Sequence, residues 1–162
     1  MKSTSNVSNT SLLNQPVVSL NDGTRIGDVS DLLIDSQKLQ LIALVLKTEG
    51  GQTVLPIANV QSFGEDAVTV GGMNATQSAA NSQPGLSSFS DLQNLTVVDS
   101  SGTKLGKIHD AEFNTSSGKM ESVEVHSGGV FGIGSKSFQL PAEDVCSLGP
   151  DLITVKDRTV VA

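Results

Sequence analysis

A chain of 162 residues leaves room for one or two small domains. Its net charge of −7 argues against direct binding of nucleic acid or anionic membranes, because both are bound through clustered positive charge. Aromatic residues make up 3% of the chain, with neither Trp nor Tyr, so we expect two small cores built mainly from aliphatic side chains.

Residues 1–11 are rich in Ser, Thr and Asn and show no apolar periodicity, which predicts a disordered tail. They lack the apolar run of a signal peptide, and the longest apolar stretch, Leu39 to Leu46, is too short to span a bilayer. The single cysteine, Cys146, cannot form a disulfide within the chain. These features favour a cytoplasmic protein without membrane insertion.

Residues 12–70 predict a first β-rich unit, because short apolar strands alternate with turn signals such as Asn21-Asp22-Gly23. Gly27 interrupts the second strand, which predicts a bulge where the strand bends. A helical turn is expected from Pro56 to Val60. The predicted strands are residues 17–20, 24–34, 39–47, 52–55, 61–63 and 67–70.

Residues 71–90 are rich in Gly, Ser, Asn and Ala, which predicts a flexible linker, within which the apolar Leu86 and Phe89 could dock on a barrel. Residues 91–157 then repeat the order of the first unit, and residues 158–162 form a C-terminal tail. Short strands with Gly-rich turns at close spacing indicate a small barrel or curled sheet. The strands predicted in this second unit are residues 96–98, 104–114, 120–126, 137–140, 145–148 and 152–155.

The two units share residues at matching positions, and such self-similarity indicates two copies of one fold. The repeated positions are Gly23 with Gly102, Gly27 with Gly106, Asp31 with Asp110, and Pro56 with Pro141. Most of them are turn and strand positions, so we interpret them as structural.

The repeated pattern Gly-Thr-x-x-Gly-x-Val/Ile-x-Asp, followed by an apolar strand, a Gly-rich hairpin and Pro-x-x-x-Val, resembles the PRC-barrel family. That family includes the cytoplasmic domain of the photosynthetic reaction centre H subunit and the C-terminal domain of a ribosome maturation factor. The resemblance implies an all-β chain of two small PRC-type β-barrels in tandem, joined by a flexible linker. It also implies that the barrels serve as docking modules without a shared active site.

The hairpin at residues 127–137 comes close to a phosphate-binding loop. Such a loop needs Gly-Lys-Ser/Thr without interruption at the start of a helix, whereas Ser135 separates Gly134 from Lys136 and a strand follows. We therefore expect no nucleotide site. Apolar residues at a hairpin tip favour contact with a partner; here they are Val130, Phe131 and Ile133.

Asp31 and Asp110 are acidic residues at matching positions in the middle of a strand. They could form a metal or proton site in each barrel, or accept backbone hydrogen bonds at a bulge. The apolar residues Val29 and Leu32 stand at an odd spacing, as a bulge between them requires. This pattern favours the structural interpretation.

Few residues suit catalysis or metal binding. His109 and His126 lie in different predicted strands, and no spacing of His, Cys and carboxylate residues is typical of zinc ligation. No serine lies in a Gly-x-Ser-x-Gly elbow. We therefore predict no catalytic residue, cofactor or metal site.

The third strand of the first unit is apolar on both faces, whereas its counterpart in the second unit alternates with polar residues. Such an apolar strip normally marks an interface. We expect the second barrel, a second copy of the chain or a partner to cover it, unless the tail or linker folds over it. The strip consists of Leu39, Leu41, Ala43 and Val45.

These features favour a non-enzymatic scaffold or adaptor that binds a protein and can self-associate through its barrel surfaces. One alternative is a ribosome-assembly or RNA-processing accessory that acts through protein binding. The other is a binder of small ligands or metals that uses the 127–137 hairpin with Asp31 and Asp110. Fold alone does not decide among them, because function depends on sites.

Overall fold

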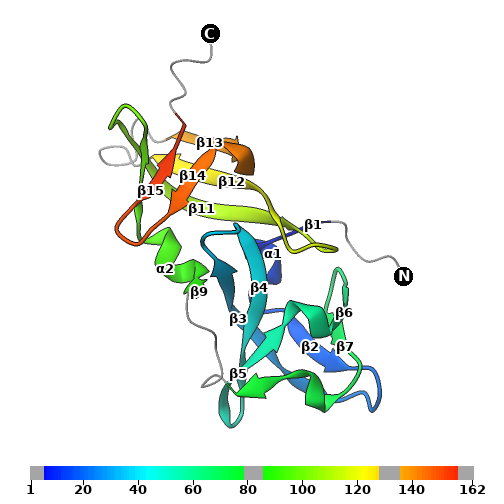
Figure 1. The fold of residues 1–162 in the computed structure, drawn as a ribbon. Helices are drawn as coiled ribbons and strands as arrows, with labels where there is room; N and C mark the ends of the chain where they lie inside the picture. The colour runs from blue at the N-terminus through cyan, green and yellow to red at the C-terminus, as the bar shows by residue number, and fades with distance from the viewer. Residues whose placement is uncertain (1–5, 79–85, 128–135, 157–162) are drawn as a thin grey trace.

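The computed structural model describes residues 6–78, 86–127 and 136–156, and these residues form two curled β-sheets (Figure 1). The all-β prediction with two barrel-like units is confirmed. None of the helices in the described part of the chain has the length and apolar character needed to cross a bilayer.

The first sheet has the strand order β6-β7-β2-β3-β4-β5-β8, in which β2 and β7 are parallel. A short 3₁₀ helix, Ile57–Asn59, follows β5 where one helical turn was predicted, and a second one, Met73–Ala75, precedes β8. The strands are β2 (Pro16–Ser19), β3 (Arg25–Asp35), β4 (Gln40–Thr48), β5 (Gly51–Pro56), β6 (Val60–Phe63), β7 (Val68–Val70) and β8 (Gln77–Ser78).

The second sheet repeats this arrangement in the order β13-β12-β11-β10-β15-β14, with β10 and β15 parallel. A 3₁₀ helix, Ala142–Asp144, occupies the position of the one in the first unit. The strands are β10 (Thr96–Asp99), β11 (Lys104–Asn114), β12 (Met120–Ser127), β13 (Lys136–Pro141), β14 (Val145–Leu148) and β15 (Ile153–Val155).

Bulges interrupt β3 and β11 at the same repeat position. The register passes from Val29 opposite Leu46 to Asp31 opposite Val45, and likewise from Ile108 opposite Val125 to Asp110 opposite Glu124. The odd apolar spacing therefore marks a real bulge. Gly106 is needed beside it, since its φ is +141° and a Cβ there would collide with the His126 carbonyl.

The structure differs from the predicted boundaries before each unit. β1 (Asn6–Ser8) lies in the predicted tail, where α1 (Asn9–Leu12) also begins, while β9 (Leu86–Ser88) lies in the predicted linker, where α2 (Phe89–Gln93) begins. Polar residues suggested disorder there, but two serines act as helix caps: Ser8 Oγ accepts the Ser11 N–H and Ser88 Oγ accepts the Asp91 N–H.

These leading segments are exchanged between the two units. β1 precedes the first unit yet pairs with β11 of the second, and β9 precedes the second unit yet pairs with β3 of the first (Figure 1). Both helices contact β3 as well as β11. The two units are therefore tied together twice, by related segments that run in opposite directions between them.

The buried side chains form one continuous cluster through both units, which corrects the expectation of two separate cores. Phe89 of α2 and Phe113 of β11 are both fully buried and meet edge to face, with ring centroids 6.4 Å apart. The exchanged helices place apolar side chains between the sheets, so two small cores merge into a larger one. Other buried side chains at this junction are Leu12, Ile34 and Leu92.

Candidate functional site

Asp31 and Asp110 hold the exchanged helices. Asp31 accepts hydrogen bonds from the Leu32 N–H at 2.8 Å, the Ser90 N–H at 3.3 Å and the Ser90 hydroxyl at 2.6 Å. Asp110 accepts from the Ala111 N–H at 2.8 Å and the Thr10 N–H at 3.1 Å. Each carboxylate therefore satisfies its own bulge and the first turn of a helix from the other unit.

The hairpin tips of the two units interlock. The Leu41 N–H donates to the Gly118 carbonyl at 2.7 Å, and the Met120 N–H donates to the Leu39 carbonyl at 2.8 Å. Leu41 and Met120 occupy the same repeat position, as do Leu39 and Gly118, so the two bonds are related by the internal repeat. The Gln40 side chain adds a bond from Nε2 to the Ser117 carbonyl at 2.6 Å.

This junction covers one end of the predicted apolar strip. Leu41 and Ala43 are buried, while Leu39 and Val45 are half-buried. The backbone bonds of Leu39 and Leu41 go to the second unit, so part of the strip is used within the chain. The predicted hairpin-tip residues Val130, Phe131 and Ile133 lie outside the described residues.

A groove of about 650 Å³ opens where the two units meet. The β3–β4 turn contributes Leu39 from the first unit, and β14 with the turn after it contributes residues 145–150 from the second. β9 lines the groove with Leu86 and Ser87. Cys146, the single cysteine of the chain, is exposed and lies in this groove.

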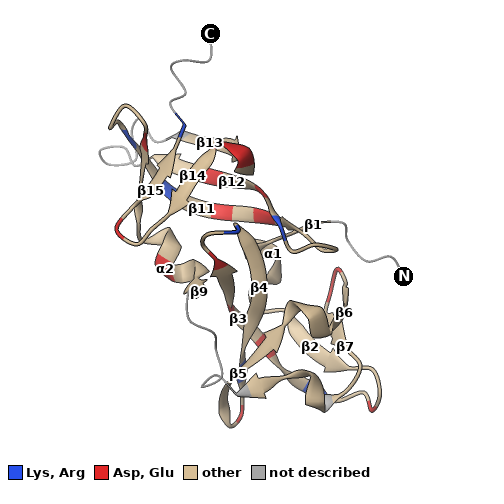
Figure 2. Cartoon of the chain, in the orientation of Figure 1, with Lys and Arg blue, Asp and Glu red and all other residues tan. Residues whose placement is uncertain are grey.

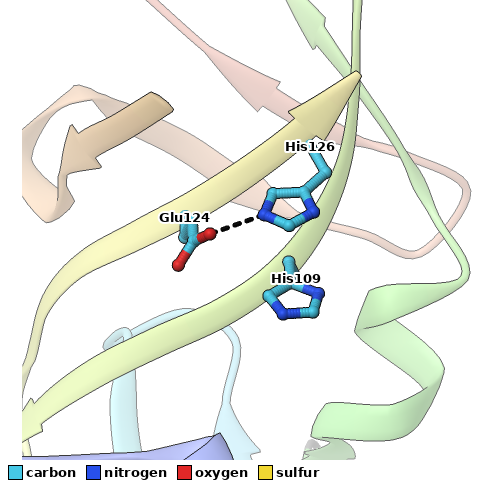
Figure 3. A group of neighbouring side chains, drawn as sticks. All are labelled: His109, Glu124 and His126. Atoms are coloured by element: carbon cyan, nitrogen blue, oxygen red, sulfur yellow. Dashed lines mark hydrogen bonds and ion pairs between the residues drawn. The ribbon is translucent and has the colours of Figure 1, made fainter. Parts of the chain in front are cut away.

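A second feature lies on the outer face of β11 and β12, where His109, Glu124 and His126 gather (Figure 3). The donor atoms of the three side chains all lie within 4.8 Å of one another. The two imidazole rings are stacked, with centroids 4.0 Å apart and planes 7° from parallel. His126 Nε2 lies 2.5 Å from Glu124 Oε2.

Spacing along the chain did not predict this cluster, because its residues come together only through strand pairing. Glu124 and His126 stand two apart in β12 and so share a face, and the bulge in β11 makes His109 the extra residue beside them. Asp31 and Asp110, considered above as possible ligands, do not belong to the cluster. A usable signal was the Glu-x-His pair in one predicted strand with a histidine in its predicted hairpin neighbour.

The turn after β2 shows how carboxylates in this chain serve structure. Asp22 Oδ1 accepts the Thr24 hydroxyl at 2.8 Å and the Thr24 N–H at 3.2 Å. The Thr24 hydroxyl is the largest cause that lowers the pKa of Asp22. Asp99 has the same structural role in the second unit, where it accepts hydrogen bonds from the N–H groups of Ser101 and Thr103.

Comparison with known proteins agrees with this architecture. The family model described as PRC-barrel domain matches the chain twice, at residues 6–77 and 84–161. Each match includes the exchanged strand and helix that precede its unit. No curated protein matches the chain.

Proposed function

The chain belongs to the PRC-barrel family, with two such domains in tandem, and we infer that it is a non-enzymatic scaffold that binds another protein. We place the binding surface in the groove between the units. PRC-barrel domains are a general type of protein-interaction module, and this groove is built jointly by both of them.

The composition of the groove is the observation that carries the proposal. The lining includes the apolar residues Leu39 and Leu86, which are half-buried, and Val145 and Leu148, which are buried. Polar residues of the β3–β4 turn and β14 line it as well. Protein interfaces combine apolar and polar residues in this way. The repeated aspartates, by contrast, are engaged in holding the two units together.

Charge indicates the kind of partner. The chain carries seventeen acidic residues against ten basic ones, and acidic positions recur along β11, β12 and the 3₁₀ helix after β13 (Figure 2). Complementary charge speeds association and excludes partners of like charge. We therefore propose a protein with a positively charged surface that inserts an apolar segment into the groove.

The single cysteine allows a direct test. A photoreactive cross-linker on Cys146 should capture the partner from a cell extract, and the same label on a Leu20→Cys, Cys146→Ser variant should not. Leu20 is 54% exposed and lies outside the groove, so it is a matched control for surface labelling.

Binding of the captured protein should then be measured with purified components. We expect Cys146→Arg to weaken binding at least tenfold through bulk and repelling charge, Leu20→Arg to leave it nearly unchanged, and added salt to weaken it. Equal capture by both labels, or equal binding by both Arg variants, would contradict a groove site. Capture of ribosomal proteins would point to the ribosome-assembly alternative, and light scattering would show whether the captured protein is a second copy.

A further inference from the structure

We propose that His109, Glu124 and His126 form a binding site for a divalent transition metal ion of the zinc type. The site is independent of the proposed protein-binding groove, because none of its residues lines that groove. Its evidence is the convergence of two imidazoles and one carboxylate from neighbouring strands.

The donor set and its spacing suit such an ion. Tetrahedral zinc holds nitrogen and oxygen ligands at about 2.0–2.2 Å, which places the donor atoms roughly 3.3–3.5 Å from one another. The three donor atoms lie within 4.8 Å of one another here, so the donor atoms would have to approach one another by about 1 Å to reach the spacing that zinc requires. The nitrogen lone pairs of the two stacked rings lie in nearly parallel planes, so the exposed His109 ring has to turn out of the stack for both imidazoles to face one ion.

The backbone beneath the cluster is well defined. β11 and β12 are paired on both sides of the bulge, from Lys107 opposite His126 to Phe113 opposite Met120. Ile108 and Val125 point into the core and are almost fully buried. Gly106 allows the close approach of β11 to the His126 carbonyl. The ligands therefore stand on a packed two-stranded base, which lowers the entropy lost when they converge on an ion.

Charge around the cluster favours a cation. A small pocket of about 90 Å³ adjoins it and is lined by Asp110, Glu112 and Glu124. Lys107 stands opposite His126 in the register and is the nearest basic residue in the pairing. Among the described side chains of β11 and β12 around the cluster, these three carboxylates outnumber the one lysine, and such an excess of negative charge raises the local concentration of cations.

The chemistry of the donors selects the class of ion. Imidazole nitrogens suit zinc, copper and nickel, whereas magnesium and calcium prefer sites made only of oxygen. Three protein ligands also leave the fourth tetrahedral position open to water or to a group from another molecule. We therefore expect binding of Zn²⁺ or Co²⁺ and indifference to Mg²⁺.

Titration of the metal-free, tag-free chain with Zn²⁺ in a calorimeter tests the site. The chain contains only two histidines and both belong to the cluster, so an untagged protein has no competing imidazole. We expect one equivalent of Zn²⁺ to bind and millimolar Mg²⁺ not to compete. Co²⁺ should bind in its place and give the visible absorption bands of a four-coordinate complex.

Variants identify the ligands. His109→Ala and His126→Ala should each weaken Zn²⁺ binding at least tenfold, and Glu124→Gln should also weaken it. Ser30→Ala and Lys47→Ala alter the equivalent positions in the first unit and should leave binding unchanged, as should Cys146→Ser, which removes the one thiol. His109 is exposed, so its replacement should leave the fold and the thermal transition intact.

Each result decides the question. Absence of saturable binding to the wild-type chain would overturn the proposal, and so would unchanged binding by His109→Ala. Loss of binding in Cys146→Ser or in the first-unit variants would move the site elsewhere. Weakened binding confined to the cluster variants would establish it, whether or not the groove binds a protein.

Discussion

The outer faces of β3–β4 and β11–β12 have the same backbone but different chemistry. The same bulge positions Ser30, Val45 and Lys47 in the first unit and His109, Glu124 and His126 in the second. The carboxylates Asp31 and Asp110, which hold the exchanged helices, are the same in both. Residues that are identical in the two repeats hold the units together. Residues that differ give the second unit a cluster of two histidines and a glutamate at positions where the first unit has Ser, Lys and Val.

The hairpin tips make a similar contrast. Leu39 and Gly118 occupy one repeat position, and both have a positive φ, of 51° and 77°. A Cβ on Gly118 would lie 2.6 Å from the Leu41 carbonyl of the first unit. The glycine is therefore required on the side where the other hairpin approaches most closely.

The largest effect should follow from Phe113→Ala, which removes a fully buried ring at the junction. We expect the free energy of unfolding to fall by about 3–5 kcal/mol, because the change deletes buried apolar surface and leaves a cavity. Since the core is continuous, denaturant unfolding should remain a single transition for both units. Leu152→Ala, at a residue 40% exposed, is the control and should change stability by less than about 1 kcal/mol. Two separate transitions in the wild-type chain would show that the units are energetically independent.

A smaller effect is expected for Gly118→Ala, which tests the interlocked hairpin tips. The substitution combines a left-handed backbone with a steric conflict at the Leu41 carbonyl, so we expect a loss of about 2–3 kcal/mol. Gly102→Ala has a similar φ of 85° but open space around its Cβ, and should cost only about 1 kcal/mol. Thermal denaturation of both variants separates the cost of the left-handed backbone, which they share, from the cost of the steric conflict with the Leu41 carbonyl, which is specific to Gly118→Ala. Equal losses of stability would show that the two hairpin tips are not in close contact.

The smallest of these effects should come from replacing Asp31 or Asp110, the carboxylates that hold the exchanged helices. Asp31→Ala removes hydrogen bonds to Ser90 of α2 as well as to its own bulge, and should cost about 1–2 kcal/mol. Asp110→Ala should cost less, because within the described part of the chain the one hydrogen bond that Asp110 accepts across the junction comes from the Thr10 N–H.

A double-mutant cycle of Asp31→Ala with Ser90→Ala isolates the contact across the junction. We expect a coupling of about 0.5–1.5 kcal/mol, since the Ser90 hydroxyl donates directly to the carboxylate at 2.6 Å. Strictly additive losses would show that Asp31 acts only on its own bulge.

Several features could be predicted from local sequence. The repeated Gly and Asp positions predicted two copies of one β fold, and the odd spacing of Val29 and Leu32 located the bulge that the register shows. The turn at Asn21-Asp22-Gly23 separates β2 from β3 as predicted. These features depend on neighbouring residues and on strand periodicity, both of which can be read from the sequence.

The exchange of the leading segments could not be predicted in this way. The segments around Ser8 and Ser88 are polar and show no periodicity, so they were predicted to be a tail and a linker. In the structure the two serines cap short helices, and the buried residues Leu12 and Phe89 of these helices pack between the units. Which sheet accepts a short strand depends on free edges and on the core it completes, and neither is visible from the strand itself.

The sequence by itself determined the repeat, the strands, the bulges and the acidic, aromatic-poor composition, because each follows from local conformational preference or simple counting. Tertiary structure alone decided that the two cores merge, that Asp31 and Asp110 reach helices of the opposite unit, and that His109 meets Glu124 and His126. The physical reason is that these contacts join residues separated by many positions, and only the pairing of strands brings their side chains within reach.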